Sequence, residues 1–351
     1  MVKSIKHIIV ALLILPVLAG CTVVGQTEQP AETSIELPLD SAQTAGEQPE
    51  GDNPQTLHRP LTFLFFSDTQ PDPELGDYTG VGEMIKRAVI NEEAPELIIF
   101  GGDTVNDGGD EFQWHEFWQA ISPALDEVTT AAVAGNHDNH ALLAGQFDYP
   151  AEAPVEPGAG YFYSLTVDSV FFIMLDSNIM GAANKRDVEW LKSEFQSESA
   201  RQADWRIVVM HHPMWPVTAI PKDIQRAETM REHFLPVFEE YGVDFILCGH
   251  QHVYSRTLEM RGDAAAGDGP GIIQFMAASG DKSYYAAGEQ NYIAAGGAAP
   301  NYLRLSISGP DNTAVAIEGK QPDGDPATGT MCTITAFDGD HRVIDEYQIK
   351  K

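Results

Sequence analysis

Acidic, amide and imidazole side chains follow five apolar runs of this 351-residue chain. Each run is typical of a strand buried on both faces. The polar residues come where each run ends: "SDTQ" after "LTFLFF", "GGDTVN" after "ELIIF", "GNHDNH" after "TTAAVA", "HHP" after "RIVVM", and "GHQH" after "DFILC". Carboxylate oxygens, amide oxygens and imidazole nitrogens suit Zn, Mn or Fe better than metals that prefer thiolates. The pattern therefore predicts a metal site.

The number of candidate ligands, about seven, is sufficient for two ions. Two ions about 3.5 to 4 Å apart can acidify a bound water and neutralise phosphoryl oxygens during in-line displacement. A carboxylate is best suited to bridge them because it has two oxygens. Residues one apart on an extended segment point the same way, but a bend after Gly249 would let His250 and His252 reach different ions.

Helical patterns separate the apolar runs. The earliest of the helical patterns has an apolar face formed by Val81, Met84, Ile85, Ala88 and Val89. A later helix is expected from about Ala227 to Tyr241, with a kink at Pro236 and its end at Gly242. Strands that alternate with helices imply a largely parallel sheet, whose carboxyl strand ends form the binding crevice. Residues distant in the sequence can converge there.

The last apolar segments indicate a second sheet. They alternate or run apolar between Gly and Asp turns: "YLRLSI", "TAVAI", "TITAFD" and "RVIDEYQI". The expected fold class is therefore α/β, a four-layer αββα sandwich of two mixed sheets flanked by helices.

The polar motifs, taken together and in this order, resemble the signature of the calcineurin-like metallophosphoesterase superfamily. They span nearly the whole region after the linker and read Asp68-x-Gln70, Gly102-Asp103-x-x-Asn106, Gly135-Asn136-His137-Asp138, His211, and Gly249-His250-x-His252. "GHQHVYSR", "HHP" and the helix "REHFLPVFEEYGVD" are similar to the purple acid phosphatase branch. The resemblance implies the metallo-dependent phosphatase fold and two divalent or trivalent ions of Fe, Mn or Zn.

The resemblance also implies residue roles. Asp68 and His252 would bind the first ion, with Gln70 beside them. The second ion would be bound by Asn136, His211 and His250, and Asp103 would bridge. His137 would protonate the leaving group or stabilise the transferring phosphoryl oxygens, and Asp138 would orient His137.

Two positions depart from the family pattern. Gln70 stands where the family commonly has His, and its amide oxygen is a weaker, neutral ligand. Asn106 stands where purple acid phosphatases have Tyr, so neither tyrosinate-to-iron colour nor an obligatory ferric ion is expected.

Other residues allow two interpretations. His212 and His140 would contact substrate or only border the site. Segments 213–223 and 277–301 would form pocket walls or serve as connections. Packing is favoured over function for four residues: Trp114, Trp118, Tyr254 and Arg256.

The N-terminus is typical of an exported bacterial lipoprotein. Residues 1–20 have two lysines before an apolar run that ends "LAGC", so Cys21 would carry lipid. The alternative is an ordinary signal peptide with a chance cysteine. Residues 21–59 form an acidic segment expected to be a disordered linker, and residues 60–351 form the phosphoesterase domain. The predicted location is extracytoplasmic, anchored by lipid to the bacterial cell membrane.

Charge and cysteine content restrict the partners. The net charge is −31, which argues against nucleic acid as a partner, although a phosphorylated small molecule can still bind where metal ions reverse the local sign of the charge. Cys248 and Cys332 are expected to be buried free thiols, with a single disulfide as the alternative.

The sequence thus predicts a dinuclear-metal phosphoesterase that hydrolyses phosphate monoesters or diesters with a metal-bound hydroxide. The rival hypothesis, motivated by Gln70, is a surface-anchored metal- or phosphate-binding protein with reduced or lost catalysis. A third hypothesis, an extracellular nuclease, conflicts with the charge.

Overall fold

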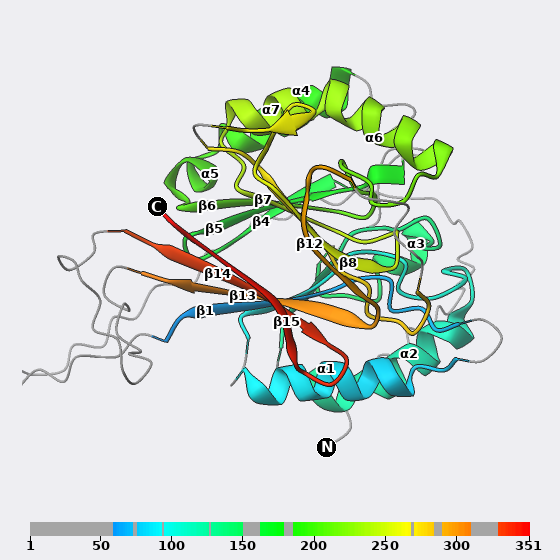
Figure 1. The fold of residues 1–351 in the computed structure, drawn as a ribbon. Helices are drawn as coiled ribbons and strands as arrows, with labels where there is room; N and C mark the ends of the chain where they lie inside the picture. The colour runs from blue at the N-terminus through cyan, green and yellow to red at the C-terminus, as the bar shows by residue number, and fades with distance from the viewer. Residues whose placement is uncertain are drawn as a thin grey trace, which may run out of the picture. The chain divides into compact units, whose positions relative to one another are not determined.

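Two mixed sheets form the centre of the computed structural model (Figure 1). The six-stranded sheet has the order β15 (Val343–Lys350), β14 (Met331–Asp338), β13 (Asn301–Ser308), β1 (Leu61–Phe66), β2 (Leu97–Phe100), β3 (Thr130–Ala132). The seven-stranded sheet has the order β12 (Ile293–Ala298), β8 (Val253–Thr257), β11 (Ile273–Met276), β7 (Phe245–Cys248), β6 (Trp205–Met210), β5 (Val170–Leu175), β4 (Phe162–Val167). A short hairpin joins β9 (Met260–Arg261) and β10 (Ala264–Ala265).

The structure describes residues 59–72, 76–92, 95–125, 128–149, 162–178, 185–267, 270–283, 290–309 and 329–351. The predicted signal peptide, Cys21, nearly all of the linker and the segment "TAVAI" lie outside these residues. Within the described ranges, no helix has the length and apolarity needed to span a membrane.

The expected division of strands between the sheets was wrong in detail. β1, β2 and β3 are parallel neighbours, as expected, but β13 pairs antiparallel with β1, with Phe63 opposite Leu305. The C-terminal strands therefore extend the first sheet, whereas β5, β6, β7 and β11 form a second parallel set. The apolar runs resemble one another, so their local pattern does not specify which strands become neighbours.

Helices cover the outer face of each sheet. α1 (Thr79–Asn91) and α2 (Glu111–Leu125) lie against the six-stranded sheet. The seven-stranded sheet packs against α4 (Lys185–Phe195), α5 (Glu198–Gln202), α6 (Pro221–His233) and α7 (Leu235–Glu240) (Figure 1). This is the predicted four-layer sandwich.

The period-2 pattern of β1 explains the layering. Leu64 and Phe66 point toward α1 and α2, while Phe63 and Phe65 join the core between the sheets. The predicted apolar face of α1 is buried at Val81, Met84, Ile85 and Ala88, as expected. Trp114 and Phe117 pack in the same core as α1, which confirms the packing interpretation of Trp114.

The helix expected from Ala227 to Tyr241 is two helices. α6 begins at Pro221, where the missing N–H of proline costs nothing, and ends at His233. Phe234 separates it from α7, whose first turn contains Pro236. Pro236 has no N–H, and in a continuous helix its ring would clash with the carbonyl group of Glu232, so a break at Phe234 replaces the predicted kink.

Candidate metal centre

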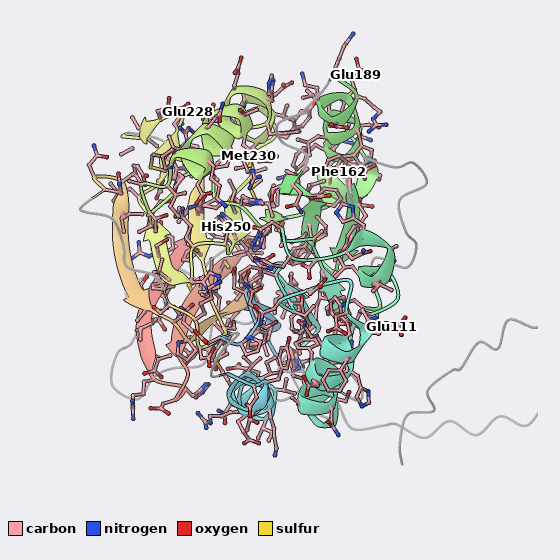
Figure 2. All side chains as sticks on the ribbon, turned by 90° about the vertical axis from the view of Figure 1, so that its right-hand side faces the viewer. Glu111, Phe162, Glu189, Glu228, Met230 and His250 are labelled. Atoms are coloured by element: carbon pink, nitrogen blue, oxygen red, sulfur yellow. The ribbon has the colours of Figure 1, made fainter. Side chains whose placement is uncertain are left out.

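The polar residues at the carboxyl strand ends converge, as the parallel arrangement predicts. One group joins Asp68, Asp103 and His211, and a second joins His211, His212 and His250. In each group, one ligand atom of every residue lies within 4.8 Å of the others. Figure 2 shows His250 below α6, the helix that carries Glu228 and Met230.

Four of these strand-end residues have left-handed backbone. The φ angles are 50° for Asp68, 51° for Asp103, 75° for His250 and 47° for His252. Asp and His tolerate this region better than most residues, yet each occurrence costs about 1 to 3 kcal/mol. Such conformations turn the chain sharply as it leaves a strand, which directs these side chains toward one another.

Asp68 is fully buried at the end of β1. Its Oδ2 accepts hydrogen bonds from the Ser67 hydroxyl (2.7 Å) and the His250 N–H (2.8 Å). Its Oδ1 has no hydrogen-bond partner among the described residues and lies 3.4 Å from Nε2 of His252. Nδ1 of His252 lies 3.0 Å from the Lys282 carbonyl oxygen, so the ring is oriented with Nε2 toward Asp68.

Gln70 is also fully buried, and neither amide atom has a hydrogen-bond partner among the described residues. An unsatisfied buried polar group costs about 1 to 3 kcal/mol. The Gln70 and Asp68 oxygens are therefore buried, unpartnered acceptors that a hard-to-borderline cation would satisfy as ligand atoms. The donor set fits ion binding at this position.

Asp103 and His211 form the centre of the cluster. Oδ1 of Asp103 accepts from the His137 N–H (2.8 Å), and its Oδ2 lies 3.2 Å from Nε2 of His211. Nδ1 of His211 donates to the Gly101 carbonyl at 2.9 Å, which leaves Nε2 for the cluster. Burial alone would lower the pKa of His211, but the carboxylates of Asp103 and Asp68 outweigh it and raise that pKa to about 10.

His250 is held by Asp223, a residue that the sequence reasoning missed. Nε2 of His250 lies 3.1 Å from Oδ1 of Asp223, so Nδ1 is the nitrogen left for an ion. The other oxygen of Asp223 accepts from the Gln251 amide at 3.0 Å, and Gln251 in turn accepts from the backbone of Val217 and Thr218. Asp223 lies in the first turn of α6, where acidic residues are common for electrostatic reasons, so the sequence carried no specific signal.

The predicted role of Asp138 is corrected by its contacts. Its carboxylate accepts from the N–H groups of Asp103 (2.7 Å), Gly135 (2.8 Å) and Thr104 (3.3 Å), so it fixes the loops after β2 and β3. Burial and the Asp103 charge raise its pKa to about 6. The group that orients His137 is the carbonyl of Asn106, 2.7 Å from Nδ1.

A pocket of about 410 Å³ opens beside the cluster. Its lining includes five predicted site residues, of which Asn136 is exposed: Asp103, Asn136, His137, His250 and His252. The two segments predicted as walls contribute Thr218, Ala219, Ile220, Lys222 and Asp223 on one side and Lys282 on the other. Residues 284–289 of the second segment lie outside the described residues.

His140 and His212 each have a ring nitrogen in contact with another side chain. Nε2 of His140 lies 3.0 Å from the buried Asp176, and this contact raises the pKa of His140. Nδ1 of His212 lies 2.7 Å from the Ser177 hydroxyl, and burial lowers its pKa. The His212 ring is 4.3 Å from that of His250, so its position favours contact with the ligand cluster over contact with solvent.

The remaining predictions concern packing. Tyr254 and Arg256 on β8 both donate to Asp345 on β15, which links the two sheets. Cys248 and Cys332 are buried free thiols, as expected, and burial raises the pKa of both.

Comparisons with known proteins identify a family and relatives that this chain resembles. A family model described as calcineurin-like phosphoesterase matches residues 61–254. An uncharacterized protein of Mycobacterium tuberculosis is 28% identical over 241 residues, covering 58% of this chain and 44% of that protein. A purple acid phosphatase of Glycine max is 24% identical over 215 residues, covering 56% of this chain and 44% of that enzyme.

The structure is also similar to that of purple acid phosphatase PPD1 from yellow lupin, Lupinus luteus. The TM-score is 0.60 at 18% identity, over 84% of this chain and 54% of the lupin chain. This likeness supports the two-sheet fold. The chain spans less than half the length of the two curated relatives described above.

Proposed function

Because this chain belongs to the calcineurin-like phosphoesterase family, we propose that it hydrolyses phosphate monoesters or diesters of small molecules with two metal ions. The observation that carries the proposal is the convergence of four strand-end motifs on mostly buried ligand atoms, beside a 410 Å³ pocket that Asn136 and His137 of the fifth motif also line. Two buried groups of these motifs, the Oδ1 atom of Asp68 and the side-chain amide of Gln70, lack hydrogen-bond partners among the described residues.

The candidate ligands would divide between two ion positions. Asp68, Gln70 and His252 would hold one ion, Asn136, His211 and His250 the other, and Asp103 would bridge. When bound, Fe, Mn or Zn ions supply an acidified water and positive charge that neutralises the phosphoryl oxygens. Asp138 keeps the loops of Asp103 and Asn136 together through its backbone hydrogen bonds.

His137 would act on the phosphate ester. Its Nδ1 must carry the hydrogen in the contact with Asn106, because a carbonyl oxygen only accepts. Nε2, 4.0 Å from Oδ2 of Asp103, is then the atom that can carry a second proton to the leaving group or donate to a phosphoryl oxygen. His137 lines the pocket, which supports this role.

The enzyme would act outside the cytoplasm, attached to the bacterial membrane by lipid on Cys21. The support is the sequence of residues 1–21 alone, with its two lysines, short apolar run and "LAGC" ending. Labelling of cells with a radioactive or alkyne fatty acid would test it, since Cys21→Ser should abolish incorporation.

The activity is tested by assaying the full chain, loaded with metal, against a panel of phosphate monoesters and diesters. The double variant Asp103→Asn, His250→Ala should lose at least about a thousandfold in kcat/KM, because electrostatic stabilisation of the phosphoryl group disappears. Glu228→Gln, an exposed change on α6, is the matched control and should keep full activity. Unchanged hydrolysis in the double variant would contradict the proposal.

The rival function is a surface-anchored binding protein for metal or phosphate, and Gln70 is the observation that favours it. Metal titration in parallel with the activity panel separates the two functions. Two bound ions with turnover support the phosphoesterase, whereas one tight ion without hydrolysis supports the binding protein.

A further inference from the structure

His212 is a buried histidine beside the ligands expected for the second ion. The residue is 1% exposed, and it is not part of the described lining of the 410 Å³ pocket. Its ring centroid lies 4.9 Å from that of His211 and 4.3 Å from that of His250. One ring nitrogen of each of the three histidines lies within 4.8 Å of the others. The three imidazoles therefore form one compact group.

The Nδ1 atom of His212 is already engaged within the protein. It lies 2.7 Å from the hydroxyl oxygen of Ser177, which also accepts a hydrogen bond from the His212 N–H at 2.9 Å. Ser177 follows β5 and His212 follows β6, and these two strands are parallel neighbours in the seven-stranded sheet. The contact fixes the ring between two strand ends, so Nε2 is the ring nitrogen left for an ion.

Nε2 of His212 is buried and has no hydrogen-bond partner among the described residues. A neutral imidazole carries its hydrogen on one nitrogen and accepts at the other. If Nε2 carried the hydrogen, a donor would be buried without an acceptor. If Nδ1 carried it and donated to Ser177, the Nε2 lone pair would be buried without a donor, and either defect costs about 1 to 3 kcal/mol. A cation at Nε2 removes this cost in the second tautomer.

The other two imidazoles of the group are held in the same way. Nδ1 of His211 donates to a backbone carbonyl at 2.9 Å, and Nε2 of His250 lies 3.1 Å from a carboxylate oxygen. A histidine that binds a metal ion almost always donates from its other ring nitrogen to an oxygen, which fixes both the tautomer and the orientation of the ring. The contact between His212 and Ser177 meets this condition.

We propose that Nε2 of His212 is a third imidazole ligand of the second ion, beside His211 and His250. The inference rests on the metal binding in the proposed function and deepens it by naming the kind of ion. The first position has one imidazole, that of His252, among oxygen ligands. Imidazole suits Zn²⁺ and Fe²⁺, whereas carboxylate and carbonyl oxygens suit Mn²⁺. The second position therefore favours Zn²⁺ or Fe²⁺ over Mn²⁺.

Metal titration of the full chain with competing chelators tests this selectivity. Ser177→Ala keeps the imidazole but removes the contact that orients it, and it should weaken Zn²⁺ binding at one position about 10- to 100-fold. His212→Gln should weaken Zn²⁺ binding at least as much. Both variants should weaken Mn²⁺ binding less, because Mn²⁺ gains less from a nitrogen ligand. His115→Gln, an exposed change on α2, is the matched control and should leave both ions unaffected.

Equal weakening of Zn²⁺ and Mn²⁺ binding in the two variants would indicate general damage to the site and overturn the selectivity. Ligation itself is tested in the unchanged protein by ¹⁵N NMR of the imidazole nitrogens, recorded in chelator and in saturating Zn²⁺. The His212 signals are assigned by their absence from the His212→Gln spectrum. Nε2 of His212 should shift together with signals of His211 and His250, while Nδ1 keeps its hydrogen.

The same spectra separate this inference from the proposed function. Unshifted His212 nitrogens beside shifted signals of His211 and His250 would overturn the inference and leave the proposed metal centre intact. A His212 shift that requires inorganic phosphate in addition to Zn²⁺ would assign the residue to substrate contact and would also overturn it. A shift with Zn²⁺ alone, in protein that hydrolyses no ester of the panel, would keep the ligand assignment and overturn the phosphoesterase function.

Discussion

At the scale of single residues, Gln70 is the candidate ligand whose surroundings are least satisfied. Its side chain is fully buried, and both amide atoms lack a hydrogen-bond partner among the described residues. Gln274 provides the contrast within the same chain. It is equally buried, but its oxygen accepts from Met214 and Trp215 and its nitrogen donates to the Trp215 carbonyl. A bound ion would account for the burial of Gln70, whereas contacts with the protein account for that of Gln274.

Replacing each glutamine with methionine should have opposite effects on the ion-free protein. Gln70→Met removes unsatisfied groups at similar volume and should raise the free energy of unfolding by about 1 to 2 kcal/mol, whereas Gln274→Met should lower it by about 2 kcal/mol or more. Urea unfolding in the presence of a chelator measures both. In excess metal, Gln70→Met should lose part of the stabilisation that ions give. Equal destabilisation by the two changes would refute ion binding at Gln70.

Asp223 is the second residue whose contacts point to ion binding. A carboxylate that holds the far nitrogen of a ligand histidine fixes the ring and raises its basicity. Asp223→Asn should therefore weaken binding of one ion about 10- to 100-fold and leave the other ion unaffected. Metal titration with competing chelators measures both constants. Glu228→Gln on the same helix is the control, and a loss no greater than in this control would count against the role.

At the scale of elements, the site depends on how closely two strand ends approach. β1 and β7 belong to different sheets, yet a Cβ atom on Gly249 would lie 1.9 Å from the Ser67 hydroxyl oxygen and 2.1 Å from Oδ2 of Asp68. Only glycine allows the loop after β7 to present the His250 N–H to Asp68 at 2.8 Å. The packing of one sheet on the other thus sets the distance between ligands.

Gly249→Ala should separate these loops. We expect a decrease of about 2 kcal/mol or more in the free energy of unfolding, the usual effect of overpacking, together with loss of tight ion binding. Gly80→Ala in the first turn of α1 is the control, because its Cβ would meet nothing within 4 Å. Thermal unfolding and metal titration test both variants. Normal ion affinity in Gly249→Ala would show that the close approach is not needed.

At the scale of the whole described domain, the candidate ions would connect the two sheets. Asp68 and Asp103 follow strands of the six-stranded sheet, whereas His211, His250 and His252 follow strands of the seven-stranded sheet. A second link, between Tyr254 and Arg256 on β8 and Asp345 on β15, joins the same sheets without an ion. Ion binding should therefore be coupled to the global stability of the domain.

Removal of metal should lower the unfolding temperature. A ligand at a hundred times its dissociation constant stabilises the folded state by about 2.7 kcal/mol, so the free energy of unfolding in saturating metal should exceed that in chelator by at least this amount. Asp345→Asn should lower stability under both conditions but keep the difference between them. An identical unfolding temperature with and without metal would contradict ion binding across the sheets.

The sequence by itself determined the segments and the chemistry. "LTFLFF" forms β1 over its full length. The polar residues after four of the apolar runs lie in one cluster, and those after the fifth border it through His137. The alternation of buried residues and the turns at strand ends are local properties of the chain, so the sequence could predict both. Local pattern also specified the apolar face of α1 and the buried free thiols.

Only the tertiary structure decided which strands are neighbours and which side chains support the ligands. The pairing of β13 with β1, the contact between Asp223 and His250, and the backbone hydrogen bonds of Asp138 all join residues distant in the sequence. Such contacts depend on how sheets and helices dock. The apolar faces of the strands are similar, so they could pack in more than one order. The close packing of the whole core selects one order, and no single segment of the sequence encodes that packing.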